Sequence, residues 1–262
     1  MTIRPKKMAA KFMISASTIR NYEANGLIPP AERSSNGYRI YTDQHAAYLS
    51  CIQAMAPAFG MVVTAEVLRC LRQDKPQDAM WIVREKEVAL YEEKEKLERL
   101  IQDIRIYANE NTSPYAEEPF TINEASDLTQ VPKSAIRYWE QAGYVTADRD
   151  PDNRYRRYSG SHLLKIRLIQ VLQSSVYSED TVNFKQSIAA AEHTDLQGVL
   201  NVAENVRTYL DKTIESQMCG VTYLYQLIQF TKASIFDGSS SRWCSFHRSE
   251  GALFAEVARP LP

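Results

Sequence analysis

The sequence predicts a mainly α-helical protein, in which two winged helix-turn-helix domains are joined by long coiled-coil helices. Two observations predict this class. The segment STIRNYEANGLI at 17–28 returns as SAIRYWEQAGYV at 134–145, and the match continues without a gap at a constant offset of 117 residues. Between the two copies, apolar residues recur every seven positions in a polar segment. A repeat of this size indicates one structural module built twice.

The first copy begins as two short helices separated by a turn at 13–15. Ser15 or Ser17 can cap the second helix, because a hydroxyl oxygen there accepts a hydrogen bond from a free backbone N–H. Asn25-Gly26 ends that helix, since glycine tolerates the left-handed conformation of a helix stop. We therefore predict a helix-turn-helix over this part of the chain.

The residues after this helix predict a two-stranded wing. Pro29-Pro30 excludes further helix. Residues 33–37 are rich in bases and hydroxyls and predict a turn, and residues 38–41 alternate as a returning strand does. Thr42-Asp43 then opens a helix with an apolar face.

The second copy repeats each step. A turn falls at 130–132, the second helix spans about 134–141, and Ala142-Gly143 ends it. The second wing holds four arginines with three interleaved aspartates: Arg149, Arg154, Arg156, Arg157, Asp148, Asp150 and Asp152. Residues 159–161 then open another helix with an apolar face.

Two segments predict coiled-coil helices. In the first, the apolar positions Val83, Leu90, Leu97 and Ile104 lie seven residues apart. A similar apolar seam runs from 196 to 224. The predicted organisation is a first domain at 1–76, a coiled-coil helix at 77–110, a linker at 111–119, a second domain at 120–190, a C-terminal helical segment at 191–236 and a flexible tail at 237–262.

Charge is unevenly distributed, although the net charge is only −1. Residues 1–50 hold seven Lys and Arg against three acids, and residues 77–118 hold eleven acids against six bases. A basic domain on an acidic helix suits a protein whose ends meet a polyanion. We find no apolar run long enough to span a bilayer, no signal-peptide core and no disulfide framework among the four cysteines. We therefore expect a cytoplasmic protein without a membrane partner.

Residues 17–30, followed by Gly37-Tyr38-Arg39-Ile40-Tyr41, resemble the DNA-binding domain of the MerR family of bacterial transcription regulators. That family shows a T-hydrophobic-R-Y-Y-E-x-x-G-L-hydrophobic-x-P segment and then a G-Y-R-x-Y wing. Here Asn21 and Tyr22 occupy the paired aromatic positions, and Tyr138 and Trp139 do so in the second copy. The resemblance covers roughly 5–73 and 120–190. It implies a sequence-specific transcription regulator with double-stranded promoter DNA and RNA polymerase as partners, associated with the nucleoid.

The resemblance places a DNA-contacting arginine at Arg20 and at Arg137. Arg39 and Arg156 in the wings suit phosphate contacts, which position a protein without reading sequence. The complete predicted DNA-binding set is Ser17, Thr18, Arg20, Asn21, Tyr22, Arg33, Tyr38 and Arg39 in the first copy, with Lys133, Ser134, Arg137, Tyr138, Arg154, Tyr155, Arg156 and Arg157 in the second.

Other prominent residues of the repeats receive structural roles. Core or wing packing, rather than base reading, is the expectation for Trp139, Tyr41 and Tyr158, and also for Tyr22 beside its place in the DNA-binding set. Glu23 and Glu140 are expected to anchor local hydrogen bonds, because phosphate repels a carboxylate. The aligned His45 and His162 are expected on the surfaces of their helices.

MerR-like proteins dimerise through an antiparallel coiled coil that follows the DNA-binding domain. In this chain the linker at 111–119 leads at once into the second domain, and nine residues span at most about 30 Å. We therefore expect one monomer to act as a pseudo-dimer with antiparallel helices and to distort promoter DNA as the family does. The alternative is a true homodimer with four DNA-binding domains, including a ligand-sensing regulator.

The residues point away from an enzyme: we find no Gly-rich phosphate loop, no metal triad and no Ser/His/Asp arrangement. We expect no cofactor and no metal, although Cys219, Cys244 and His247 together could offer three ligands. The aromatic residues of 223–236 are expected in a core rather than in a ligand site. An architectural or recombination-directionality protein is the competing interpretation, which the coiled-coil helices oppose. The target promoter, any inducer, the choice of activation or repression and the role of the tail stay open.

Overall fold

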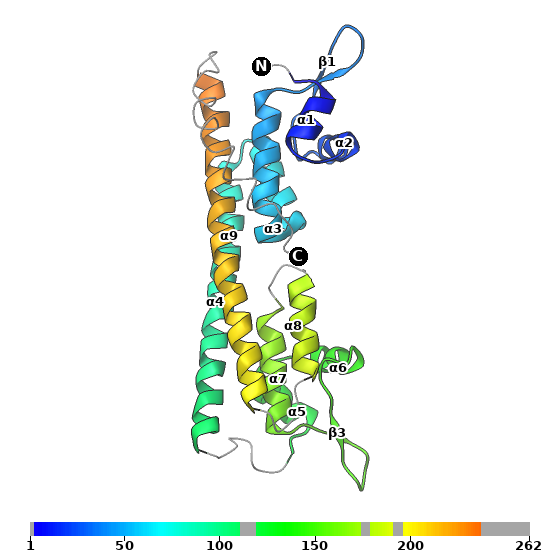
Figure 1. Cartoon of the computed structure of the whole chain (residues 1–262), viewed down its shortest axis with the longest axis vertical. Coiled ribbons are helices and arrows are strands. Elements are labelled where there is room, and N and C mark those ends of the chain that lie inside the picture. The colour runs from blue at the N-terminus through cyan, green and yellow to red at the C-terminus, as the bar shows by residue number, and fades with distance from the viewer. Residues whose placement is uncertain (1–2, 111–118, 174–178, 191–195, 237–262) are drawn as a thin grey trace. The chain divides into compact units, whose positions relative to one another are not determined.

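A computed structural model describes residues 3–110, 119–173, 179–190 and 196–236 (Figure 1). These residues are mainly helical and fall into two compact units. The first comprises residues 1–56, 61–80 and 219–262, and the second comprises residues 57–60 and 81–218. The tail with Cys244 and His247, and the linker apart from Pro119, lie outside the described residues.

The first unit contains the first copy of the repeat. Its elements are α1 (Pro5–Lys11), α2 (Ala16–Ala24), β1 (Glu32–Arg33), β2 (Arg39–Ile40) and most of α3 (Asp43–Arg72). The strands are antiparallel, with Arg33 opposite Arg39, and a further bridge joins Ile3 to Tyr41. Met8, Ile19, Ile28 and Leu49 are fully buried and form part of the domain core. The predicted helix-turn-helix and wing are therefore present.

Helix α3 corrects the expectation that no segment could span a bilayer. Among the described residues it is the one helix whose length and apolar composition would allow a crossing. However, Gly60 has a positive φ of 78° and breaks the helix into two parts. Leu49, Ile52 and Met55 of its first half are buried in the protein core. Inside the protein, 44% of the apolar window of α3 is buried, and a core helix can have the same length and apolar composition as a membrane span.

The second unit contains the second copy and most of two long helices. Its elements are the greater part of α4 (Pro76–Glu110), α5 (Ile122–Thr129), α6 (Lys133–Gln141), β3 (Asp148–Arg149), β4 (Arg156–Arg157), α7 (Gly160–Val171), α8 (Glu179–Ala190) and the first half of α9 (Leu196–Phe236). Phe120 bridges to Tyr158 as Ile3 does to Tyr41. The two copies therefore share the same order of elements.

The two wings differ by one residue. Arg39 pairs with Arg33, which leaves 34–38 in the turn, whereas Arg156 pairs with Arg149, which leaves 150–155. The gapless sequence match had aligned Arg33 with Asp150 instead. The residues of this longer second turn form a side-chain network of their own.

Within the second unit, α4 and α9 run antiparallel. Lys94 Nζ lies 3.8 Å from Asp211 Oδ1, and Arg105 forms an ion pair with Glu204. Residue numbers therefore increase along α4 in the direction in which they decrease along α9. Leu97, Ile101 and Ile104 of α4 and Val199, Ala203, Val206 and Leu210 of α9 are buried in one core. This confirms the predicted antiparallel coiled-coil helices, which we call the stalk.

Candidate nucleic-acid interface

Helix α2 presents a polar face to solvent. Ser15 caps it, because its hydroxyl oxygen accepts the Thr18 N–H at 3.0 Å. Ile19 is fully buried, while Ser17, Arg20 and Asn21 are exposed. Residues three and four apart share one side of a helix, so these three side chains lie together. Thr18 is only partly exposed, and its hydroxyl lies 2.8 Å from that of Ser15.

Helix α6 presents the equivalent face in the second domain. Ile136 and Trp139 are buried, and Ser134, Arg137 and Tyr138 are exposed at the same spacing of three and four. The preceding Lys133 is also exposed, and its Nζ donates to Asn123 Oδ1 at 2.9 Å. The structure therefore places the exposed helix residues of the predicted DNA-binding set on one face of each helix: Ser17, Arg20 and Asn21 on α2, and Ser134, Arg137 and Tyr138 on α6.

The first wing exposes an aromatic side chain at the end of its turn. Gly37 adopts a φ of 76° in the turn, a conformation that glycine tolerates without strain. The Ser34 N–H donates to the Tyr38 carbonyl at 2.8 Å, and Arg33 Nη1 donates to the Gly37 carbonyl at 3.1 Å. Tyr38 is 73% exposed. The predicted wing residues Arg33 and Tyr38 thus face solvent from a closed turn.

A carboxylate joins the second helix of each helix-turn-helix, α2 or α6, to its wing. In the first domain, Glu23 Oε2 accepts from Arg39 Nε at 2.8 Å, and Glu23 Oε1 accepts from the Ala31 N–H at 3.1 Å. In the second, Glu140 Oε2 accepts from Arg156 Nε at 2.6 Å, which raises the pKa of Arg156. These contacts confirm the local anchoring predicted for both glutamates. They also give Arg39 and Arg156 a positioning role beside the predicted phosphate contacts.

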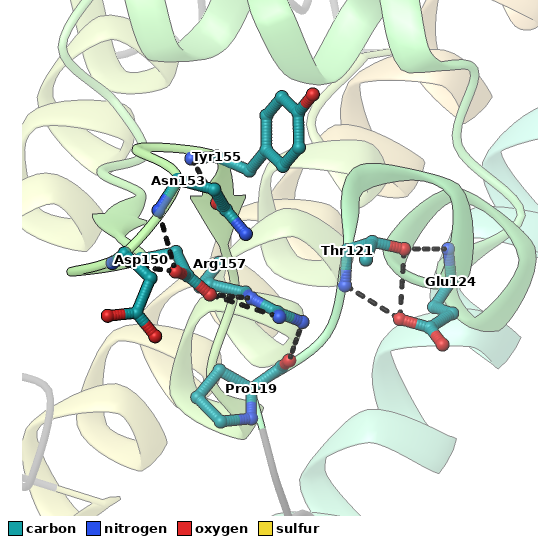
Figure 2. A network of polar contacts seen from close by, with 8 residues as sticks. Pro119, Thr121, Glu124, Asp150, Asn153, Tyr155 and Arg157 are labelled. Carbon is teal, nitrogen blue, oxygen red and sulfur yellow. Dashed lines mark hydrogen bonds and ion pairs between the residues drawn. The ribbon is translucent and has the colours of Figure 1, made fainter.

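The second wing is held by a network around Asp150 (Figure 2). Asp150 Oδ1 accepts from the N–H groups of Asp152 and Asn153, at 3.1 and 3.2 Å, and Oδ2 accepts from Arg157 Nε at 3.1 Å. The backbone N–H of Asn153 is the main cause that holds the pKa of Asp150 below its usual value. Arg157 Nη1 also donates to the Pro119 carbonyl at 3.2 Å. Arg157 therefore ties the wing to the start of the domain.

Arg154 and Tyr155 are the last two residues of this second turn. Arg154 has a positive φ of 63° and is exposed, and Tyr155 is 72% exposed. The Tyr155 N–H donates to Asn153 Oδ1 at 2.9 Å. Of the second-wing residues predicted to bind DNA, these two are the most accessible.

The two aligned histidines correct a prediction. His45 is 4% exposed and His162 is fully buried, so neither lies on a helix surface. Each occupies the third position of the helix after a wing, where Nδ1 accepts the N–H of the capping residue at 3.0 Å, Thr42 in one domain and Ser159 in the other. Burial lowers the pKa of His45. A histidine can thus be buried at this position because its ring nitrogen accepts a backbone N–H that is otherwise without a partner at the start of the helix.

The aromatic residues of the repeats are placed as expected. Tyr41, Tyr158 and Trp139 are at most 3% exposed and belong to the cores of their domains. Tyr22 is partly exposed beside the exposed face of α2. The C-terminal aromatic cluster differs from the expectation of a core position: Tyr223 and Phe230 are partly exposed and Tyr225 is 58% exposed, whereas Leu224 and Leu227 are buried.

Helix α1 adds a basic surface that was missing from the predicted site. Arg4, Lys6, Lys7 and Lys11 are all exposed in or beside it. The only sequence signal for them was the excess of bases in the first fifty residues, because charge alone does not show which helix face a lysine occupies.

The described residues show no metal site. Within those ranges, no three His, Cys, Asp or Glu side chains come together as a metal would require. Burial raises the pKa of the Cys51 thiol to about 12, so this thiol stays protonated and is a poor ligand.

Both copies match MerR family models. Residues 4–41 match the MerR family regulatory protein, and residues 120–182 match the MerR HTH family regulatory protein. The chain is 34% identical over 67 residues to the HTH-type transcriptional regulator CueR of Escherichia coli O157:H7, covering 25% of this chain and 50% of that protein. It is 29% identical over 121 residues to the mercuric resistance operon regulatory protein of Bacillus cereus, covering 44% of this chain and 92% of that protein.

A third match is to an enzyme. The chain is 31% identical over 65 residues to the type II methyltransferase M.Eco47II of Escherichia coli, which covers 25% of this chain and only 16% of that enzyme. The chain thus spans half or less of the length of several curated relatives that it matches. No solved structure gives a significant match to the chain.

Proposed function

Because the chain belongs to the MerR family, with two MerR-type domains in tandem, we propose that it is a sequence-specific regulator of transcription that binds promoter DNA. The observation that carries this proposal is the pair of exposed polar faces on α2 and α6, each braced to a wing by a glutamate–arginine pair. In a helix-turn-helix protein, the second helix reads base edges in the major groove. Arg20 and Arg137 occupy the centre of these faces.

We further propose that one chain does the work of a dimer. The antiparallel pairing of α4 with α9 inside a single chain supports this proposal, because MerR-like proteins obtain the same pairing from two chains. The two reading faces differ, with Ser17, Arg20 and Asn21 in one and Ser134, Arg137 and Tyr138 in the other. A pseudo-dimer should therefore bind two unlike half-sites, where a symmetric dimer binds a palindrome.

Transcription would be regulated through the bending or untwisting of the bound promoter DNA. Bending or untwisting a promoter costs several kcal/mol, which contacts to phosphates offset. We propose that the bound promoter is distorted so that RNA polymerase can engage it, and that the protein acts in the cytoplasm at the nucleoid without catalysing a reaction.

The first experiment is selection of bound DNA from a genomic library, followed by the mass of the complex in solution. We expect one chain of 29.9 kDa on one asymmetric, two-part site. Two chains on a palindrome would keep the DNA-binding assignment and refute the pseudo-dimer. Bending of the selected DNA without any effect on transcription would favour an architectural role.

Arg20→Ala and Arg137→Ala test the reading faces. A lost arginine contact to a base costs about 1–3 kcal/mol, so each variant should bind the selected site roughly five- to a hundred-fold more weakly in a fluorescence anisotropy titration. Lys86→Ala, on an exposed position of the stalk, is the matched control. If the double arginine variant binds as tightly as the wild type, the assignment of α2 and α6 as reading helices is wrong.

A further inference from the structure

The two domains carry different charge over equivalent residues. Residues 3–41 and 120–158 are the same length and are each closed by an equivalent bridge, Ile3 to Tyr41 and Phe120 to Tyr158. The first stretch has seven Lys and Arg against two Glu, a formal charge of +5. The second has six Lys and Arg against six Asp and Glu, a formal charge of 0.

Ion pairs increase the difference between the two domains in the positive charge that is available to phosphate. In the first domain, one of the seven bases, Arg39, contacts a carboxylate in the described structure. The other six are all exposed: Arg4, Lys6, Lys7, Lys11, Arg20 and Arg33. In the second domain, half of the bases are held by Glu140 or Asp150, namely Arg149, Arg156 and Arg157. The second domain therefore offers phosphate about half as many unpaired cations.

The contrast is sharpest on the first helix of each domain. Helix α1 carries Lys6, Lys7 and Lys11, where α5 has Asn123, Glu124 and Leu128. The Glu124 carboxylate accepts the Thr121 N–H at 2.7 Å, which lowers its pKa and keeps it ionised. In helix-turn-helix domains the first helix crosses the DNA backbone. Helix α1 would thus meet phosphates with three cations, and α5 would meet them with an anion.

We infer that the two domains contribute unequally to DNA binding, with α1 of the first domain as the main phosphate-contacting surface and the second domain adding little salt-dependent affinity. This inference rests on the proposed function. Each phosphate that a cation neutralises releases counterions and steepens the salt dependence of binding by about 0.9 in log–log slope. The unequal contribution is therefore measurable as a slope.

The test is the salt dependence of binding by the full chain to its selected site, measured by fluorescence anisotropy from 0.05 to 0.3 M KCl. The variant Lys6→Gln, Lys7→Gln, Lys11→Gln should lower the magnitude of the slope by roughly 2 to 3. Lys86→Gln, Lys212→Gln, Lys232→Gln makes the same charge change at exposed positions of α4 and α9, and should leave the slope unchanged.

The reciprocal variant gives α5 the residues of α1 at two aligned positions. Asp127→Ala with Leu128→Lys replaces an exposed acid and an exposed apolar residue with the pair found at Ala10 and Lys11. It should steepen the slope by about 1. Circular dichroism of each variant checks that the helices are intact.

Two results would overturn the inference. One is an α1 variant whose slope matches that of the stalk control, and the other is an α5 variant that gains no slope. In both cases the wild type still binds its selected DNA, so the proposed function survives. Failure of the wild type to select any DNA would instead remove the proposed function itself.

Discussion

Replacing Glu23 by Ala removes the carboxylate that joins α2 to the first wing. In the wild type this carboxylate accepts the Ala31 N–H at 3.1 Å and Arg39 Nε at 2.8 Å. The Glu23 side chain is 14% exposed and that of Arg39 is 30% exposed. The variant therefore leaves two donors without their acceptor in a partly desolvated place.

The free-energy cost of Glu23→Ala depends on how well each freed donor can form a hydrogen bond with water instead. A hydrogen bond to a charged group contributes about 1.5–3 kcal/mol when desolvated, whereas exposed ion pairs contribute about 0.2–1 kcal/mol. Arg39 is exposed enough to recover part of its hydration, so we assign about 1 kcal/mol to each bond. A total of about 2 kcal/mol should make local opening of the wing roughly thirty-fold more frequent.

Amide hydrogen exchange in the full chain measures this opening directly. The Ala31 amide should exchange roughly thirty-fold faster in Glu23→Ala. In Glu23→Gln an amide oxygen still accepts the Ala31 N–H, so the acceleration should be several-fold smaller. Glu32→Ala is the matched control, because Glu32 is an exposed carboxylate of the same wing. Equal Ala31 exchange rates in Glu23→Ala and the wild type would refute the reasoning.

Two further predictions concern the caps and the second wing. Burial lowers the pKa of His45 in the folded protein. As the pH falls below about 6.5, the imidazole is therefore protonated in the unfolded chain before it is protonated in the folded one. The free energy of unfolding is thus not reduced by His45 above that pH and decreases below it. The melting temperature should therefore fall from pH 7.5 to pH 5.5 by less in His45→Gln, which keeps an acceptor at the cap, and an equal fall in both proteins would contradict this. Asp150→Ala should speed exchange of the Asn153 amide while Asp150→Asn does not, since only the first variant removes the acceptor. The pKa of Asp150 is lowered in the folded protein, so its ionised carboxylate stabilises the second wing above about pH 4. This stabilisation is lost as the pH falls through the pKa of Asp150 in the folded protein, and the exchange rate of the Asn153 amide across that range measures the loss.

Local signals in the sequence located the helices well. The second helix was predicted from about 134 to 141 and is found at Lys133–Gln141, and the long helix predicted at 77–110 is found at Pro76–Glu110. The same signals failed at the second wing, where the gapless repeat aligned Arg33 with Asp150 although Arg149 is the residue that pairs with Arg156. A turn can lengthen by one residue while the sequence pattern of its flanking strands stays the same. The side-chain hydrogen bonds within the turn hold it together, and the spacing of residues in the sequence does not show them.

The helix residues predicted to bind DNA are mostly exposed, as a DNA-contacting role requires, but the sequence did not predict the hydrogen-bond partners of the neighbouring wing residues. Ser134, Arg137 and Tyr138 were each predicted to bind DNA, and the structure exposes them together on one side of α6. The sequence could not show that Arg157 would donate to the Pro119 carbonyl, 38 residues away. Contacts of that range depend on where the backbone returns, which no local pattern encodes.

The sequence by itself determined that one module is built twice, that each copy is a helix-turn-helix with a wing, and that long helices follow. Those features arise from repeats, caps and apolar periodicity, which act over a few residues. The tertiary structure decided which charges are neutralised. Glu23 and Arg39 lie 16 residues apart in the chain, as do Glu140 and Arg156, and only folding brings each pair within 3 Å. It also decided that His45 and His162 are buried caps, because burial depends on what packs over a helix end rather than on the residue itself.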